Sequence, residues 1–213
     1  MVSNFDFLKK DFPVLSNFGK MAEKYCYSDS NSCLMKLGMI GETIVNLMFT
    51  YDRIAFPHDN TAVARIDTLS REGLLTSDLV TILHGLRKVR NKAVHENYAS
   101  IADDKIFLPM AHSLCEWFMQ TYGDWNYSHR DFVMPEENTV SGTVDKEAEE
   151  KKESELTKLA EQMAAAAPII EQTERKKQAY KAANQRPKTE AETRFLIDEQ
   201  LRMVPVRVKQ ELY

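Results

Sequence analysis

The fold of this chain is decided first by residues 76–96, which read TSDLVTILHGLRKVRNKAVHE. Thr76 is a residue type that favours the helix N-cap, and the apolar residues after it recur at three- and four-residue spacing. At about 100° per residue they share one face of a helix. The members of this stripe are Leu79, Ile82, Leu83, Leu86, Val89 and Ala93. The spacing predicts an amphipathic helix whose apolar stripe belongs to a packed core.

The same helix carries a compact polar group near its end. Asn91 and His95 are four residues apart and are therefore neighbours on the helix surface. Arg90 projects beside the apolar stripe, where a guanidinium needs an anionic partner because an unpaired buried charge is very costly. Glu42 is the only charged residue in the apolar stretch 37–51. We therefore expect a buried ion pair between Arg90 and Glu42.

The order of Arg90, Asn91 and His95 resembles the R-x4-H motif of the HEPN superfamily, which comprises small helical bundles of prokaryotic defence and toxin systems. Many of its members are metal-independent endoribonucleases, in which two motifs meet across a homodimer interface. The resemblance implies that His95 is the general acid and base and that Arg90 stabilises charge on the phosphate. It implies that Asn91 orients the phosphate or the imidazole, with Glu42 in support.

A wider set of segments resembles the helical domain that begins many type I restriction enzyme R subunits. The likeness covers residues 5–122, and a short motif at 188–202 is similar to the stretch that leads into the nuclease domain of those subunits. The chain departs from the pattern at Gly38, where relatives often carry a basic residue. The segments that carry the likeness are FLKKDFPVL, AEKYCYSDSNSCLMKLGMIGETIVNLMF, LRKVRNKAVHE and TEAETRFLIDEQLR.

Composition restricts the functions that this chain can have. The net charge is −4, so any nucleic-acid contact needs a local basic patch. The best candidates are Arg87, Lys88 and Lys92, close to Arg90 on the predicted helix. The three cysteines lack metal-ligand spacing and are expected to be reduced thiols of a cytoplasmic protein. No metal or other cofactor is expected, and no apolar run approaches the roughly 18 residues of a membrane span.

The order of patterns predicts an all-α chain with four parts. A HEPN-like helical bundle is expected over 1–122. Its first segment, 5–27, is expected to contain a helix that starts near Pro13, and further helices are expected near 31–51, 62–72, 76–95 and 104–122, with Asn60 as the cap of the helix at 62–72. Residues 123–144 are expected to form a linker or strap. A charged, exposed, coiled-coil-like helix is expected over 145–186, with Pro168 as a kink or an end. A short helix within 187–213 resembles the lead-in to a restriction nuclease domain.

Three functions are consistent with these patterns. The first is an accessory domain of a type I restriction-like DNA defence system, which contacts nucleic acid, RNA or DNA, or other restriction-modification subunits. It would have no ATPase or metal-dependent nuclease core, because the chain lacks a phosphate-binding G-x4-G-K-[ST] loop and the combination of an acidic residue with a following E-x-K that is typical of those nucleases. The second is a homodimeric HEPN endoribonuclease that uses Arg90 and His95. In the third, the polar group only fixes helix packing, and the chain is a scaffold or antitoxin-like partner whose helix 145–184 docks another protein.

Overall fold

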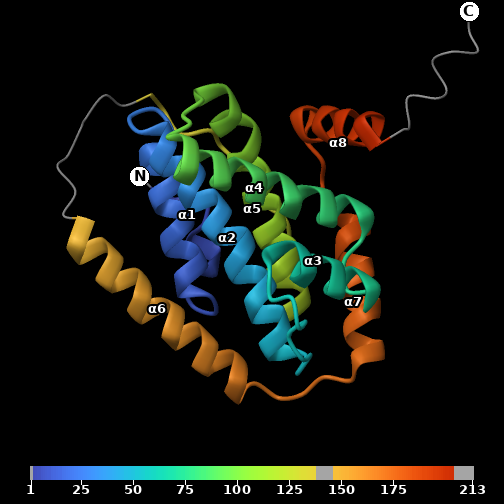
Figure 1. The fold of residues 1–213 in the computed structure, drawn as a ribbon. Helices are drawn as coiled ribbons and strands as arrows, with labels where there is room; N and C mark the ends of the chain where they lie inside the picture. Colours follow the sequence, from blue (N-terminus) through green and yellow to red (C-terminus); the bar gives the residue numbers. More distant parts are fainter. Residues whose placement is uncertain (1, 138–145, 204–213) are drawn as a thin grey trace, which may run out of the picture.

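The computed structural model describes residues 2–137 and 146–203, and within these ranges it contains helices and no strands. The all-α prediction is confirmed. Figure 1 shows a bundle of helices with α6 along one side and α7 and α8 along the other. The elements in chain order are η1 (Asp6–Leu8), α1 (Pro13–Tyr25), α2 (Ser30–Tyr51), α3 (Ala62–Arg71), α4 (Ser77–Glu96), α5 (Ile101–Tyr122), α6 (Lys146–Ala166), α7 (Gln172–Gln185) and α8 (Glu190–Met203).

Local sequence signals explain where several helices begin. Pro13 occupies the first turn of α1, where its missing N–H removes no hydrogen bond. Asp29 and Ser100 cap α2 and α5, since their side chains accept hydrogen bonds from backbone N–H groups of the first turn. The prediction that Asn60 caps α3 is wrong. Thr61 is the cap, and the side chain of Asn60 instead accepts a hydrogen bond from Arg65 Nε at 2.8 Å.

Helix α2 is the central element of the bundle. It packs against α1, α3, α4, α5 and α6, which explains why its sequence is apolar on almost every side. By its length and hydropathy alone, α2 could also cross a membrane. However, 61% of its most apolar 18-residue stretch is buried inside the protein. The composition of α2 is therefore accounted for by the core that forms around it.

The apolar stripe predicted for residues 76–96 lies in that core. All six of its members are buried in α4, whose bounds differ from the prediction by one residue at each end. Helix α4 ends at Asn97, which adopts a left-handed conformation with φ of 50°. That conformation is common for asparagine after a helix and stops the hydrogen-bond ladder.

The segment predicted as one helix over 145–184 forms two helices. Pro168 lies in the break between α6 and α7, because proline has no N–H to continue the ladder. Most side chains of α6 are exposed, as predicted, and α6 is fastened to α2 by Lys36, which pairs with Glu149 at 3.1 Å and also with Glu153. Helix α7 instead packs against α5, so the core extends beyond residue 122.

A buried ion pair fixes α7 to the ends of α2 and α5. Arg175 Nε lies 3.1 Å from Asp52 Oδ1, and both side chains are 2% exposed. The Tyr122 hydroxyl donates to the same carboxylate at 2.6 Å, and the guanidinium lies 4.3 Å from the Tyr122 ring centroid. Arg175 also donates to the carbonyl of Thr121. Burial raises the pKa of Asp52, and the contacts from Tyr122 and Arg175 oppose that rise.

Glu116 holds the irregular strap that follows α5. Its buried carboxylate accepts from the Tyr127 hydroxyl at 3.1 Å and from the Arg130 N–H at 2.8 Å, and it lies 3.0 Å from His129 Nδ1. Three groups of the strap therefore meet one side chain. Residues 123–137 keep a defined path without regular structure, and the predicted strap residues 138–144 lie outside the described part of the chain.

The last described helix, α8, docks across α4 and α5. Phe195 lies over Gly85, where an added Cβ would come within 2.6 Å of the phenyl ring, so only glycine permits this approach. Arg186 anchors the turn before α8, since it pairs with Glu192 at 2.5 Å and donates to the Ser113 hydroxyl at 2.8 Å. The end of the sequence, 204–213, lies outside the described residues.

We predict that Arg175→Ala destabilises the protein by about 3–5 kcal/mol, because it leaves the Asp52 carboxylate buried without its counter-ion. Urea denaturation followed by circular dichroism measures the loss. Arg194→Ala is the matched control: it removes an arginine whose pair with Glu190 is largely exposed, so little change is expected. A loss for Arg175→Ala as small as that of the control would contradict the prediction.

A second prediction concerns the buried carboxyl group of Asp104. Asp104 is fully buried in the first turn of α5, and its oxygens have no hydrogen bond of good geometry within the described residues. Burial raises its pKa to about 6 from 3.8, although the nearby Ser30 hydroxyl and Cys33 thiol oppose the rise. The Asp104 carboxyl therefore binds its proton more tightly in the folded state than in the unfolded state.

Because the folded pKa lies above the unfolded one, the stability from protonated Asp104 is fully present below about pH 4. It is lost as the pH rises through about 6. Asp104→Asn cannot ionise, so its free energy of unfolding relative to the natural protein should increase between pH 4.5 and pH 7.5. Urea denaturation at several pH values in this window measures the difference. A difference that is independent of pH would refute this account of Asp104.

Candidate functional site

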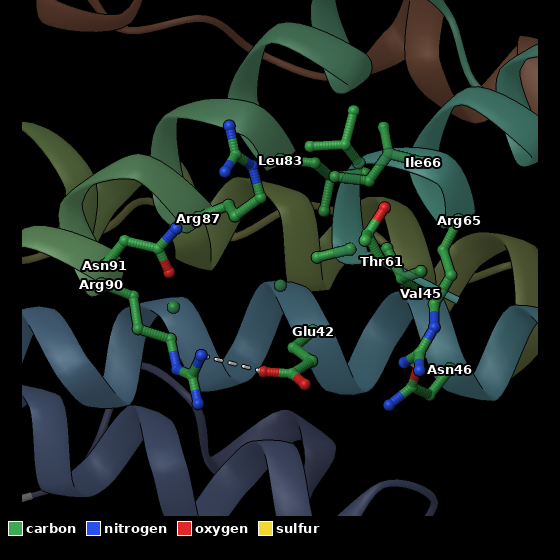
Figure 2. Close-up of a pocket in the computed structure, with 14 residues that line it drawn as sticks. Glu42, Val45, Asn46, Thr61, Arg65, Ile66, Leu83, Arg87, Arg90 and Asn91 are labelled. Atoms are coloured by element: carbon green, nitrogen blue, oxygen red, sulfur yellow. Dashed lines mark hydrogen bonds and ion pairs between the residues drawn. The ribbon is translucent and has the colours of Figure 1, made fainter. Parts of the chain in front are cut away.

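The predicted site forms where α4 crosses α2. Gly38 permits the contact, since a Cβ at this position would lie 2.3 Å from the Cβ of Arg90. The glycine at position 38, where relatives often carry a basic residue, therefore has a steric reason. Because Gly38 has no side chain, Arg90 lies directly against the backbone of α2 at this position. From there Arg90 Nη1 reaches Glu42 Oε2 at 3.4 Å, as Figure 2 shows.

The ion pair between Arg90 and Glu42 exists, but the expectation that it is buried is wrong. The two side chains are 36% and 42% exposed. Glu42 lies at the open edge of α2, where water screens the charges, so the pair contributes little to stability. Its importance lies in the direction that it gives Arg90.

Both residues line a cavity between α2, α3 and α4. Its volume is about 360 Å³, and its apolar lining includes Val45, Ile66 and Leu83. Arg87 and Asn91 join Arg90 on the α4 wall, each one turn or less away from its neighbour. The structure thus brings together four of the predicted site residues, Glu42, Arg87, Arg90 and Asn91.

His95 does not line this cavity. It is exposed in the last turn of α4 and has no hydrogen bond or ion pair within the described residues. Residues five apart on a helix point about 140° away from each other, so Arg90 and His95 face different directions. Within one chain, the arginine and the histidine of the motif therefore do not form one site.

Lys88 and Lys92 also point away from the cavity. Lys88 pairs with Glu199 of α8 at 2.6 Å, and this contact lowers the pKa of the Glu199 carboxyl. Lys92 is exposed, and its Nζ lies 5.3 Å from the ring centroid of Tyr98. Lys92 therefore presents its positive charge on the outer surface of α4, whereas the charge of Lys88 is partly neutralised by Glu199.

Sequence reasoning missed the α3 side of the cavity. Arg65 lies at this side and donates to Asn46 Oδ1 at 2.7 Å, while its guanidinium lies 5.3 Å from the Phe56 ring centroid (Figure 2). Thr61 and Ala62, at the start of α3, complete the wall. No sequence signal pointed to them, because only the packing of α3 against α2 and α4 places Arg65 in the wall of the cavity that Arg90 also lines.

Two negative findings restrict the chemistry of the site. No group of three or more histidine, cysteine, aspartate or glutamate side chains is arranged to hold a metal ion in residues 2–137 and 146–203. The thiols Cys26, Cys33 and Cys115 are buried and unbridged, and burial raises the pKa of Cys115 above its ordinary value. The groups available at the cavity are arginines, one carboxylate, amides and a hydroxyl.

Fold and site together define a helical bundle whose central helices enclose a cavity with arginines in its walls. The chain belongs to the DUF4145 family, a domain of unknown function, which it matches over residues 20–162. The matched region contains α2 to α5 and hence every residue of the cavity. No solved structure matches the chain.

The chain is also similar to the type I restriction enzyme EcoKI endonuclease subunit of Escherichia coli (strain K12). The two sequences are 26% identical over 138 residues, which are 63% of this chain and 11% of that protein. The resemblance to a restriction enzyme subunit is thereby supported. The chain spans only this small share of the relative's length.

We predict that Gly38→Ala disturbs the site, because its Cβ would overlap the Cβ of Arg90, which cannot rotate away. The two helices must separate, at a cost of roughly 1–3 kcal/mol. Gly41→Ala is the matched control. Its Cβ would lie 3.4 Å from the nearest atom of Leu86, an ordinary contact, and alanine favours a helix by roughly 0.8–1.0 kcal/mol over glycine. Thermal denaturation compares the two, and equal stability of both variants would contradict the steric argument.

Proposed function

We propose that this chain is a helical accessory domain of a type I restriction-like DNA defence assembly, located in the cytoplasm. It would contact nucleic acid or the restriction-modification subunits and would contain neither the motor nor the nuclease core. The similarity to the endonuclease subunit is the observation that carries this proposal. That protein is an endonuclease subunit by name, and the 138 matched residues are 11% of it.

The surface of α4 supports the nucleic-acid part of the proposal. Lys92 is exposed, and Lys88, one turn earlier on the same helix, is half exposed and paired with Glu199, which a phosphate would displace. Lysines in such positions neutralise backbone phosphates without reading sequence. Since the chain as a whole carries a net charge of −4, binding through these residues would be local and sensitive to salt.

The second candidate is a homodimeric HEPN endoribonuclease. The observation in its favour is the exposure of His95 in the last turn of α4. A histidine on the surface one turn beyond Asn91 is free to meet the Arg90 of a second chain. The same exposure weakens the reading in which His95 only fixes helix packing. In this proposal, activity requires two chains, because the two residues point apart within one.

One experiment with two arms tests both proposals. In the first, fluorescence anisotropy measures the binding of labelled duplex DNA at several salt concentrations. We expect the double variant Lys88→Gln, Lys92→Gln to weaken binding and to reduce the slope of log K against log salt by about 1 for each lysine. Lys151→Gln, Lys152→Gln on exposed α6 is the charge-matched control and should bind like the natural protein.

The second arm incubates the protein with single-stranded RNA in EDTA. The accessory proposal expects no cleavage. Cleavage that disappears in His95→Ala, with the fold intact, would support the ribonuclease instead, since its chemistry needs no metal. DNA binding that is absent, or equal in both double variants, would reject the role assigned to α4.

A further inference from the structure

The cavity between α2, α3 and α4 holds positive charge that the protein itself does not neutralise. Arg87 forms no ion pair with any described residue, and its Nε–H is buried without a hydrogen-bond acceptor. In Figure 2 its guanidinium points away from Arg90 and Glu42, so it does not share that carboxylate. Buried donors in native proteins almost always have a partner. The Nε–H of Arg87 lacks such an acceptor among the described residues.

A second arginine of the cavity also lacks a carboxylate. Arg65 is held by the neutral side chains of Asn46 and Asn60 and by the Phe56 ring. The third, Arg90, meets Glu42 at 3.4 Å, which is long for a charge-assisted hydrogen bond. The walls of the cavity thus carry three arginines and one carboxylate, and only Arg90 contacts that carboxylate. The wall also includes Thr61 and Ala62 at the start of α3, where the helix dipole adds positive potential.

The environment of His84, one turn before Arg87, agrees with this excess charge. Its pKa lies below the ordinary value, chiefly because of burial and next because of the charge on Arg87. Asp67, whose carboxylate lies 3.7 Å from His84 Nε2, opposes this fall in the pKa.

The rest of the cavity has the properties of a small-molecule site. Its volume of about 360 Å³ lies within the range of roughly 300–1,000 Å³ for ligand pockets. Val45, Ile66 and Leu83 give it an apolar wall suited to an organic body. The side-chain amide of Asn91 has no hydrogen bond within the described residues and is available to a ligand.

We propose that this cavity binds a small organic phosphate, with the phosphate at Arg87 and the organic body against Val45, Ile66 and Leu83. Phosphate suits Arg87, because the planar donors of a guanidinium can bind two phosphate oxygens at once. The apolar wall distinguishes such an ester from inorganic phosphate, which has no surface to bury there. This site is independent of the proposed contacts of Lys88 and Lys92, which point away from the cavity.

Isothermal titration of the full chain tests the site, with phenyl phosphate as the probe. We expect saturable binding that is about tenfold tighter than that of inorganic phosphate, and no binding of benzyl alcohol. Arg87→Met, which keeps the apolar stem, should weaken phenyl phosphate by about tenfold or more. Arg194→Met is the control, because Arg194 is exposed on α8 and should leave binding unchanged.

A second variant guards against loss of fold. Ala62→Phe should fill the cavity and abolish binding of the probe, while circular dichroism verifies the helices of both variants. No saturable binding of phenyl phosphate, or equal binding by Arg87→Met, would overturn the proposal. The proposal would also be overturned if a DNA or RNA oligonucleotide displaced phenyl phosphate and its binding required Arg87. In that case Arg87 would belong to a nucleic-acid-binding surface. DNA binding that depends only on Lys88 and Lys92 leaves the accessory function standing whatever the probe does.

Discussion

The close approach of α4 to α2 is the constraint on which the rest of the structure depends. Helix α2 contacts α1, α3, α4, α5 and α6, so its position sets theirs. Gly38 allows the two helices to come so near that Arg90 lies on the backbone of α2. With a larger residue there, the helices would stand further apart, and the cavity against α3 would change its shape. The fold and the arginine site therefore share one steric cause.

Charged side chains attach the later helices to this apolar centre. Lys36 fastens α6, the pair of Arg175 and Asp52 fastens α7, and the hydrogen bond from Arg186 to the Ser113 hydroxyl of α5 fastens the turn before α8. These helices bury mainly small apolar residues, such as Ala160, Ala179 and Ala182. Small residues provide little hydrophobic stabilisation. Buried ion pairs define where each helix lies, since removal of one partner leaves a charge without compensation.

The sequence was informative where one helix determines the outcome by itself. Apolar spacing located α2, α4 and α5, and Pro168 marked the break between α6 and α7. The pairing of Arg90 with Glu42 was found because one carboxylate stood alone on an apolar helix. Three features depend instead on how helices that are distant in sequence are placed in space. They are the exposure of that pair, the role of Arg65 and the contact between Arg175 and Asp52. Periodicity within one helix carries no information about that placement.

The pair of Arg175 and Asp52 also has a consequence for the order of folding. Its two residues are separated by 123 positions in the chain, and the acceptors of Arg175 stand at the ends of α2 and α5. Contacts this distant require closure of a long loop, so they form after the helices that supply them. A contact absent from the transition state affects the unfolding rate far more than the folding rate. We therefore expect the pair of Arg175 and Asp52, which attaches α7 to the bundle, to slow unfolding and to have little effect on the folding rate.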